Sequence, residues 1–391
     1  MNSLNIYIVK ALLIFAIISL AGLSAIYNYQ QAVTYLLVPL ILFMGLSLNN
    51  FTFTSLANTY SKYFLGILIV GILVLTFSTN LSVGFQNLVT LAGVYLAILL
   101  TIELLQFRFY DFSETFLISF VLSFLLLSFF LLLDNGGNAA EVSEDYIDRS
   151  QFDLNANIYS YFSYFANMSL FYLIQIKGKK LYMILSWICI VLGVYLSFIT
   201  ASRSGILFTF FISVIYWLFI FNKLRINTFF RTLIVVAIIS YGIKYIYDIY
   251  DTSFLKTRVT ESIESGDGRE TLAKEAIMIF LQHPITGVGP GQFFLYASNK
   301  SSFSHNSFTE MAANMGVAGL LLLLFLFIQP FFKELKNQHR GDKTIKKLNL
   351  LFFFSFILYN NFYVFYLTTY GMIFFFLVIM IQKKNWNQQL S

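Results

Sequence analysis

The candidate catalytic base of this chain is a histidine at the start of a predicted helix. His305 lies in the polar segment Ser304-His305-Asn306, and the following Ser307-Phe308-Thr309-Glu310 has the S-x-x-E spacing of a capping box, so we expect a helix to begin near His305. The positive end of that helix dipole disfavours an imidazolium, so we expect a neutral ring that accepts a proton near pH 7. His305 is therefore a candidate general base. The alternative is a turn residue that only satisfies backbone groups.

Two arginines stand in unusual places and are candidate anion ligands. Arg203 lies in a short polar break, Thr200-Ala201-Ser202-Arg203-Ser204-Gly205, between two apolar segments, where a charge is costly unless it is paired or functional. Arg269 starts a predicted loop helix, where the positive helix end disfavours a cation and suggests a distant partner. The alternatives are an Arg203 side chain that snorkels to lipid headgroups and an Arg269 side chain that is solvated.

Two guanidinium groups and one neutral imidazole suit the transfer of a group from a lipid pyrophosphate to a hydroxyl. A guanidinium binds phosphate oxygens in a fork and neutralises charge on a departing pyrophosphate without a metal, while the histidine takes the proton of the attacking hydroxyl. A metal remains open through the acidic loop that contains Glu141, Glu144, Asp145 and Asp148. Because those acids lack tight ligand spacing, we expect a solvated loop, no metal site and no cofactor.

The composition predicts what positions these residues. The chain has 391 residues, of which 58% are hydrophobic and 11% charged, with a mean hydropathy of +0.74. Such values exclude an ordinary soluble protein and predict an all-α polytopic membrane protein. The lone Cys189 lies in an apolar run, which argues against a disulfide framework or a thiolate metal site.

Hydrophobic runs predict about twelve transmembrane helices. They centre on residues 7–27, 32–49, 63–79, 87–105, 114–133, 156–176, 181–200, 204–221, 232–248, 312–331, 348–366 and 368–382. If both termini are cytoplasmic, the loops rich in Lys and Arg all fall on the cytoplasmic side, as the retention of basic loops requires. This topology puts His305, Arg203 and Arg269 at the outer face. The net charge of +6 is thus a topology signal, so we expect a lipid bilayer and no nucleic acid as partner.

A large outward-facing loop, residues 249–306, is predicted to contain short helices. From Arg269 the pattern gathers Leu272, Ala273, Ala276, Ile279 and Phe280 on one helix face, which can lie along the outer membrane interface. Pro284 ends this helix, and Gly287-Val288-Gly289-Pro290-Gly291 follows it. We interpret that segment as a plain turn, because no strand precedes it and Pro290 lacks an N–H donor for a nucleotide phosphate.

These motifs together resemble the O-antigen ligase and O-antigen polymerase family. The resemblance is carried by Ala201-Ser202-Arg203-Ser204-Gly205, Gly268-Arg269, His283-Pro284, the glycine-rich turn and His305-Asn306 with Glu310, Gly316 and Gly319. It implies a glycosyltransferase of the outer side of the bacterial inner membrane, with an undecaprenyl-pyrophosphate-linked glycan as donor, and neither nucleotide nor metal. It also implies that Arg203 and Arg269 hold the pyrophosphate and that His305 activates the acceptor hydroxyl, with Asn306, Glu310 and Lys300 as possible supporting residues.

The resemblance also suggests three regions and leaves the acceptor open. We expect N-terminal transmembrane helices over 1–195, the ligase- or polymerase-like core over 196–332, and a cytoplasmic loop with C-terminal helices over 333–391. The acceptor is either another lipid-linked glycan, as in a polymerase, or a lipid A core, as in a ligase. The outward charges of Lys256, Arg258 and Lys300 favour a polymerase, which holds a second anionic headgroup. Other classes are a transporter or flippase for lipid-linked sugars and an inert membrane scaffold.

Overall fold

The computed structural model of this chain is a bundle of helices. It describes residues 3–21, 33–48, 54–134, 142–143, 146–147, 157–200, 202–221, 268–298, 303–337 and 341–387. The elements in chain order are α1 Ser3–Ala21, η2 Val33–Leu37, α3 Val38–Leu48, η3 Ser55–Ala57, α4 Thr59–Val74, η4 Leu75–Phe77, α5 Leu81–Phe107, α6 Phe109–Asp134, β1 Val142–Ser143, β2 Tyr146–Ile147, α7 Asn157–Lys177, α8 Lys180–Ile199, α9 Arg203–Ile215, η5 Tyr216–Ile220, α12 Gly268–Gln282, α13 Phe293–Tyr296, α14 Ser307–Lys336, α15 Lys343–Tyr359, η6 Phe365–Leu367 and α16 Thr369–Asn387. Apart from one antiparallel pair of two-residue strands, the regular structure described is helical, which confirms the predicted class.

Several helices have the length and composition of membrane spans. Within the described residues five qualify: Thr59–Phe77, Leu81–Phe107, Phe109–Leu132, Lys180–Ser197 and Ser307–Lys336. Most of the other predicted spans also coincide with apolar helices, whereas 232–248 lies outside the described residues. The predicted span 348–366 is wrong at its end, because α15 stops at Tyr359 and Asn360 begins a turn. The chain is an all-α polytopic membrane protein, and the total of twelve spans stays a prediction.

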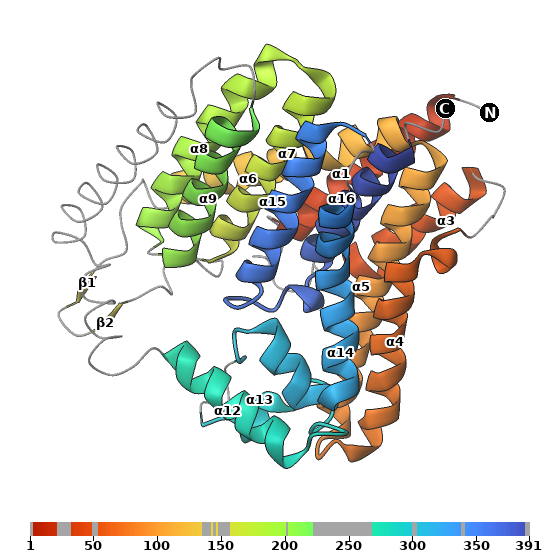
Figure 1. The fold of residues 1–391 in the computed structure, drawn as a ribbon, viewed down its shortest axis with the longest axis vertical. Helices are drawn as coiled ribbons and strands as arrows, with labels where there is room; N and C mark the ends of the chain where they lie inside the picture. The colour runs from red at the N-terminus through yellow and green to blue at the C-terminus, as the bar shows by residue number, and fades with distance from the viewer. Residues whose placement is uncertain are drawn as a thin grey trace. The chain divides into compact units, whose positions relative to one another are not determined.

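The helices form two compact units. Unit 1 consists of residues 1–119, 268–341 and 352–391, and unit 2 of residues 120–267 and 342–351. In unit 1, α4, α5 and α14 run side by side, and α12 and α13 pack against α14 at the end remote from Lys336 (Figure 1). In unit 2, α7, α8 and α9 pack on one another. His305 and α12 therefore belong to unit 1, and α9 belongs to unit 2.

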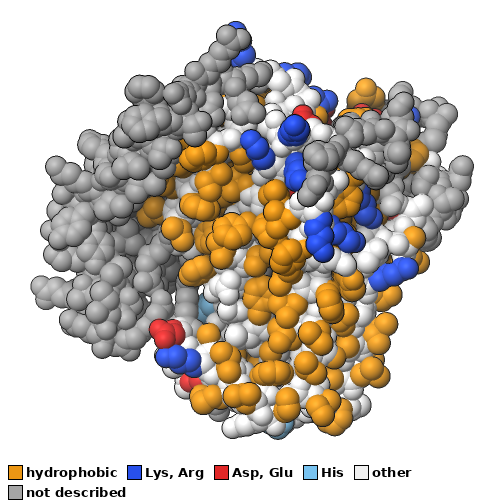
Figure 2. All heavy atoms as spheres, viewed as in Figure 1, with side chains coloured by type: hydrophobic (Ala, Val, Ile, Leu, Met, Phe, Trp, Pro, Cys, Tyr) orange, Lys and Arg blue, Asp and Glu red, His pale blue; other side chains and the backbone are white. Residues whose placement is uncertain are grey.

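Unit 1 has an apolar surface and a basic end, as a membrane-embedded bundle requires. Figure 2 shows hydrophobic side chains covering the visible face of α4 and α14, with Lys and Arg side chains gathered beyond them. Exposed apolar residues on these two helices include Ile69, Ile72 and Leu73 on α4 and Leu321 and Phe325 on α14. Side chains of this kind face lipid more readily than water.

Candidate functional site

A break in α14 sets the framework of the site. Gly316 has φ 65° and ψ −163°, so the helix is interrupted between residues 307–315 and residues 317–336. The carbonyls of Ala313 and Asn314 lose their helical partners there and instead accept hydrogen bonds of 2.9 Å from the amides of Val288 and Gly289. The amide of Val317 donates to the Pro284 carbonyl at 2.8 Å. The turn after α12 therefore replaces the hydrogen bonds that the break removes.

This arrangement confirms the interpretation of the glycine-rich segment as a turn. Gly287 has φ 62°, and a Cβ added there would lie 2.5 Å from the Asn314 carbonyl oxygen. A side chain at this position would therefore clash with α14 as well as strain the backbone. Because the amides of Val288 and Gly289 already donate to α14, the segment holds the break and does not offer these donors to a phosphate.

His305 has a strained backbone just before α14. Among the described residues, it is the one non-glycine residue with positive φ, at 58°. This left-handed conformation is uncommon for residues with a side chain, although histidine adopts it more readily than branched residues. Such a conformation persists where neighbouring contacts impose it. The side chain is half-buried.

Asn306 caps the helix, and the predicted capping box is wrong. The Asn306 Oδ1 atom accepts hydrogen bonds from the amides of Phe308 at 2.9 Å and Thr309 at 3.2 Å, so α14 begins at Ser307. Glu310 is consequently one position too far along the helix to reach back to the cap. The Ser307 hydroxyl lies instead within hydrogen-bonding distance of Asn360 Oδ1 and of the Tyr363 carbonyl. The predicted helix start near His305 holds to within two residues.

Glu310 fixes the residue before His305. Its side chain is almost fully buried, with 2% of its surface exposed. One carboxylate oxygen accepts a 2.7 Å hydrogen bond from the Ser304 amide, and the other accepts a 3.2 Å bond from the Asn314 side-chain amide. Asn314 Oδ1 in turn accepts from the amide of Phe293, in α13, at 2.8 Å. This chain of hydrogen bonds connects the backbone before His305 to α13.

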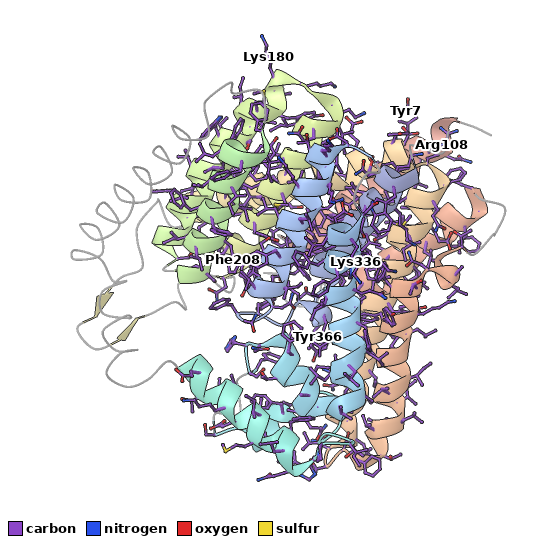
Figure 3. All side chains as sticks on the ribbon, viewed as in Figure 1. Tyr7, Arg108, Lys180, Phe208, Lys336 and Tyr366 are labelled. Atoms are coloured by element: carbon purple, nitrogen blue, oxygen red, sulfur yellow. The ribbon has the colours of Figure 1, made fainter. Side chains whose placement is uncertain are left out.

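The loop between α15 and α16 supports the same segment from another side. Asn306 Nδ2 donates to Asn361 Oδ1 at 3.1 Å, and the Ser307 amide donates to the Asn360 carbonyl at 2.8 Å. Tyr366, which is labelled in Figure 3, comes from this loop and interacts with Glu310 and Asn314. Burial, and after it the Glu310 carboxyl, raise the pKa of the Tyr366 phenol well above its usual value, so this hydroxyl stays protonated as a donor.

Sequence reasoning missed most of these supporting residues. Asn314, Asn360, Asn361 and Tyr366 were not predicted as site residues, although three of them are amides inside or beside apolar runs. A polar residue within an apolar run is costly in a bilayer and commonly has a dedicated partner, so these amides were the available signal. Of the predicted supporting residues, the structure brings Asn306 and Glu310 into contact with the segment around His305, while Lys300 lies outside the described residues.

Both candidate arginines lie at helix starts, which the sequence predicted for Arg269. Arg203 is the first residue of α9, and Ser202 caps that helix by accepting a 3.4 Å hydrogen bond from the Gly205 amide. The Ser202 hydroxyl also lies 3.2 Å from Asn157 Oδ1 of α7. Arg269 is the second residue of α12. The backbones of both arginines are described, and their pyrophosphate contacts stay predictions.

The described residues contain no cluster suited to hold a metal. No group of three or more His, Cys, Asp or Glu side chains comes together within the part of the chain that the structure describes. The acidic residues Glu141, Glu144, Asp145 and Asp148, and the basic residues Lys256 and Arg258, lie outside that part. The expectation that the site works without a metal therefore rests on the sequence argument.

Comparison with known families agrees with the resemblance seen in the sequence. Residues 188–324 match the family model described as O-antigen ligase. The matched stretch includes Arg203, Arg269, His305 and the break at Gly316, and it supports a role in the synthesis of O-antigen or another surface polysaccharide. No curated protein shows significant similarity to the chain.

Proposed function

We propose that this membrane protein, which carries an O-antigen ligase domain over residues 188–324, moves a glycan from undecaprenyl pyrophosphate to a sugar hydroxyl at the outer face of the bacterial inner membrane. The observation that carries the proposal is the fixed backbone around His305. Ser304 is held by Glu310 and Asn306 by Asn361, so the imidazole projects from a segment that is anchored on both sides. A base held in this way needs little reorganisation when substrates bind.

In the proposed reaction His305 takes the proton of the acceptor hydroxyl. The hydroxyl oxygen attacks the anomeric carbon of the donor sugar, and the bond between that carbon and the pyrophosphate oxygen breaks. Undecaprenyl pyrophosphate leaves with the bonding electron pair, and Arg203 and Arg269 bind the charge on its phosphates. Glu310 and Asn306 act on the backbone beside His305, so they are positioning residues.

The distribution of lysines supports the proposed orientation in the membrane. Lys62 of α4, Lys333 of α14 and Lys384 of α16 gather at one end of unit 1, where Lys333 lies 5.1 Å from the ring centroid of Tyr60 and Lys384 lies 5.2 Å from that of Tyr110. Lysine-rich ends are retained in the cytoplasm. The break at Gly316 lies toward the opposite end of α14 from these lysines, and α12 and α13 pack against α14 there. The proposal therefore assigns α12 and α13 to the outer side.

The test is synthesis of a new glycosidic bond by the purified protein. The protein in liposomes is given undecaprenyl-pyrophosphate-linked glycan and acceptor, and products are analysed by gel and mass spectrometry. We expect a lengthened or transferred glycan with wild type and at least about a hundredfold less with His305→Gln. A protein that only moves the donor across the bilayer unchanged would be a transporter, and the proposal would be wrong.

For the acceptor we propose another lipid-linked glycan, which makes the protein a surface polysaccharide polymerase. The supporting feature is the positive charge of Lys256, Arg258 and Lys300, which the sequence predicts to face outward and which suits a second anionic headgroup. The alternative is ligation to a lipid A core, and the description of the matched family as O-antigen ligase favours it. Deletion of the gene separates the two: loss of a polymerase leaves single repeats on the final anchor, whereas loss of a ligase leaves long chains on undecaprenyl pyrophosphate.

A further inference from the structure

Helix α12 has two apolar faces, and only one of them is buried. Leu272, Ala276 and Ile279 pack in a core cluster that also contains Val288, Phe293, Ala297 and Ala313. This is the face that the sequence predicted to lie on the membrane, so that assignment is wrong. A different set of apolar side chains points outward: Ile277, Met278 and Leu281, the last with 69% of its surface exposed.

The outward side of α12 changes in character along the helix. In the first two turns Glu270 and Lys274 form an exposed ion pair of 2.7 Å. After Glu275 the helix has no charged residue. The exposed large apolar residues are Ile277, Met278 and Leu281, followed just beyond the helix by Ile285, whose surface is 76% exposed. Gln282 and His283 between them are exposed as well. An ion pair suits water or headgroups, whereas this many exposed apolar side chains in one place suit contact with another apolar phase.

The exposed apolar end of α12 is continuous with the apolar surface of α14. Val317 donates its amide to the carbonyl of Pro284, so Ile285 and Val317 lie beside each other. Val317 is 41% exposed and begins the exposed stripe that continues through Leu321 and Phe325. Figure 2 shows charged side chains where α12 begins and hydrophobic ones where it ends.

The lengths of α4 and α14 place this junction near a membrane boundary. Sixteen residue steps separate Val317 from Lys333, which corresponds to about 24 Å of helix. Fifteen steps separate Lys62 from the exposed Phe77 at the end of η4, or about 23 Å. Both lengths approach the hydrocarbon thickness of about 30 Å, and lysine side chains add reach at their end. Val317 and Phe77 therefore lie at the boundary opposite the lysines.

We propose that the last two turns of α12, together with Ile285, insert into the membrane interface on the side opposite the lysine-rich end. The occupant of this surface is lipid, because the surface is continuous with the stripe of α14 that faces the bilayer. The charged first turns of α12, which contain Arg269 and Glu270, then remain among headgroups and water. The membrane holds α12 so that its N-terminal turn meets the headgroup layer. This inference rests on unit 1 alone and does not require the proposed reaction.

The test measures the environment of single labels in the full-length protein. Cys189 is replaced by Ala, a nitroxide is attached to Leu281→Cys or Met278→Cys, and Lys274→Cys serves as the matched control from the charged half of the same helix. The protein is placed in liposomes of phosphatidylethanolamine and phosphatidylglycerol. Accessibility to oxygen, which concentrates in lipid, is compared with accessibility to a water-soluble nickel complex.

We expect the labels at 281 and 278 to be several-fold more accessible to oxygen than to the nickel complex, relative to the label at 274. Both positions are exposed, so the label should not disturb the core. Equal nickel accessibility at 281 and 274 would show that the surface faces water. Protection from both reagents would show that a protein covers it. Either result would overturn the proposal, and neither depends on catalytic activity.

Discussion

Removal of the Glu310 carboxylate should lower the turnover that depends on His305, although the imidazole itself is unchanged. In Glu310→Ala the Ser304 amide and the Asn314 side-chain amide both lose their acceptor. A buried donor that loses its acceptor costs about 1–3 kcal/mol, so loss of the Ser304 bond alone removes that much stabilisation from the conformation that holds His305. The left-handed backbone conformation of His305 costs about 1 kcal/mol. Once the Ser304 hydrogen bond is lost, this cost favours relaxation of the segment to another conformation.

These figures predict a fall in turnover and little change in donor affinity. A loss of about 1–3 kcal/mol corresponds to a decrease in kcat of about 5- to 160-fold. Glu310→Gln keeps one oxygen for the Ser304 amide, but its amino group faces the Asn314 donor, and Asn314 cannot flip without losing its bond from Phe293. We therefore expect Glu310→Gln to stay within about tenfold of wild type.

The assay compares kcat and KM of the folded protein in liposomes with those of a matched control. Glu334 is a second fully buried carboxylate of α14, near the lysine-rich end, and it accepts hydrogen bonds from Gln382 at 2.8 Å and from Trp386 at 2.9 Å. Glu334→Ala should lower stability by a similar amount and leave kcat per folded molecule nearly unchanged. If Glu310→Ala reduces kcat no more than Glu334→Ala does, Glu310 has only a structural role.

Four further outcomes follow from the same site. His305→Ala and His305→Gln should each lose about a hundred- to ten-thousand-fold in turnover with donor binding retained, because neither side chain accepts the proton; activity within a few-fold of wild type in His305→Gln would reduce this residue to a turn former. Arg203→Ala and Arg269→Ala should abolish transfer in inserted protein, with partial rescue by Lys, which lacks the guanidinium fork; normal donor binding and turnover would contradict this. Asn306→Ala should destabilise the start of α14 by about 1 kcal/mol, as measured by thermal unfolding. A reporter fused after Ser391 should be active only in the cytoplasm, and periplasmic phosphatase activity would reverse the topology.

The sequence was informative where local patterns decide structure. Hydrophobic runs predicted the helices, and Gly268-Arg269 with Pro284 predicted the bounds of α12, which ends at Gln282. The histidine and both arginines were selected as candidates because their types are unusual beside apolar segments, and their roles stay predictions. These signals operate over a few residues, so they are readable without tertiary structure.

What the sequence could not provide comes from contacts between distant segments. The run from Met311 to Phe327 has the pattern of one continuous helix, yet it breaks at Gly316 because the turn at Gly287 supplies the replacement hydrogen bonds. Tyr366 is more than fifty residues from Glu310 in the chain. The sequence correctly predicted which face of α12 is apolar, but it assigned that face to the membrane interface. In the structure the same face packs against α13 and α14.

The same contacts connect the membrane surface to the proposed base. The buried face of α12 packs with Phe293 of α13, whose amide donates to Asn314, and Asn314 donates to the carboxylate that holds Ser304 beside His305. A lipid contact that fixes α12 therefore also fixes the height of His305 above the bilayer. For a donor whose pyrophosphate is confined to the headgroup layer, that height decides whether the imidazole meets the attacking hydroxyl. The break in α14 matters for the same reason, because a continuous helix would lack the carbonyls that bind the turn after α12.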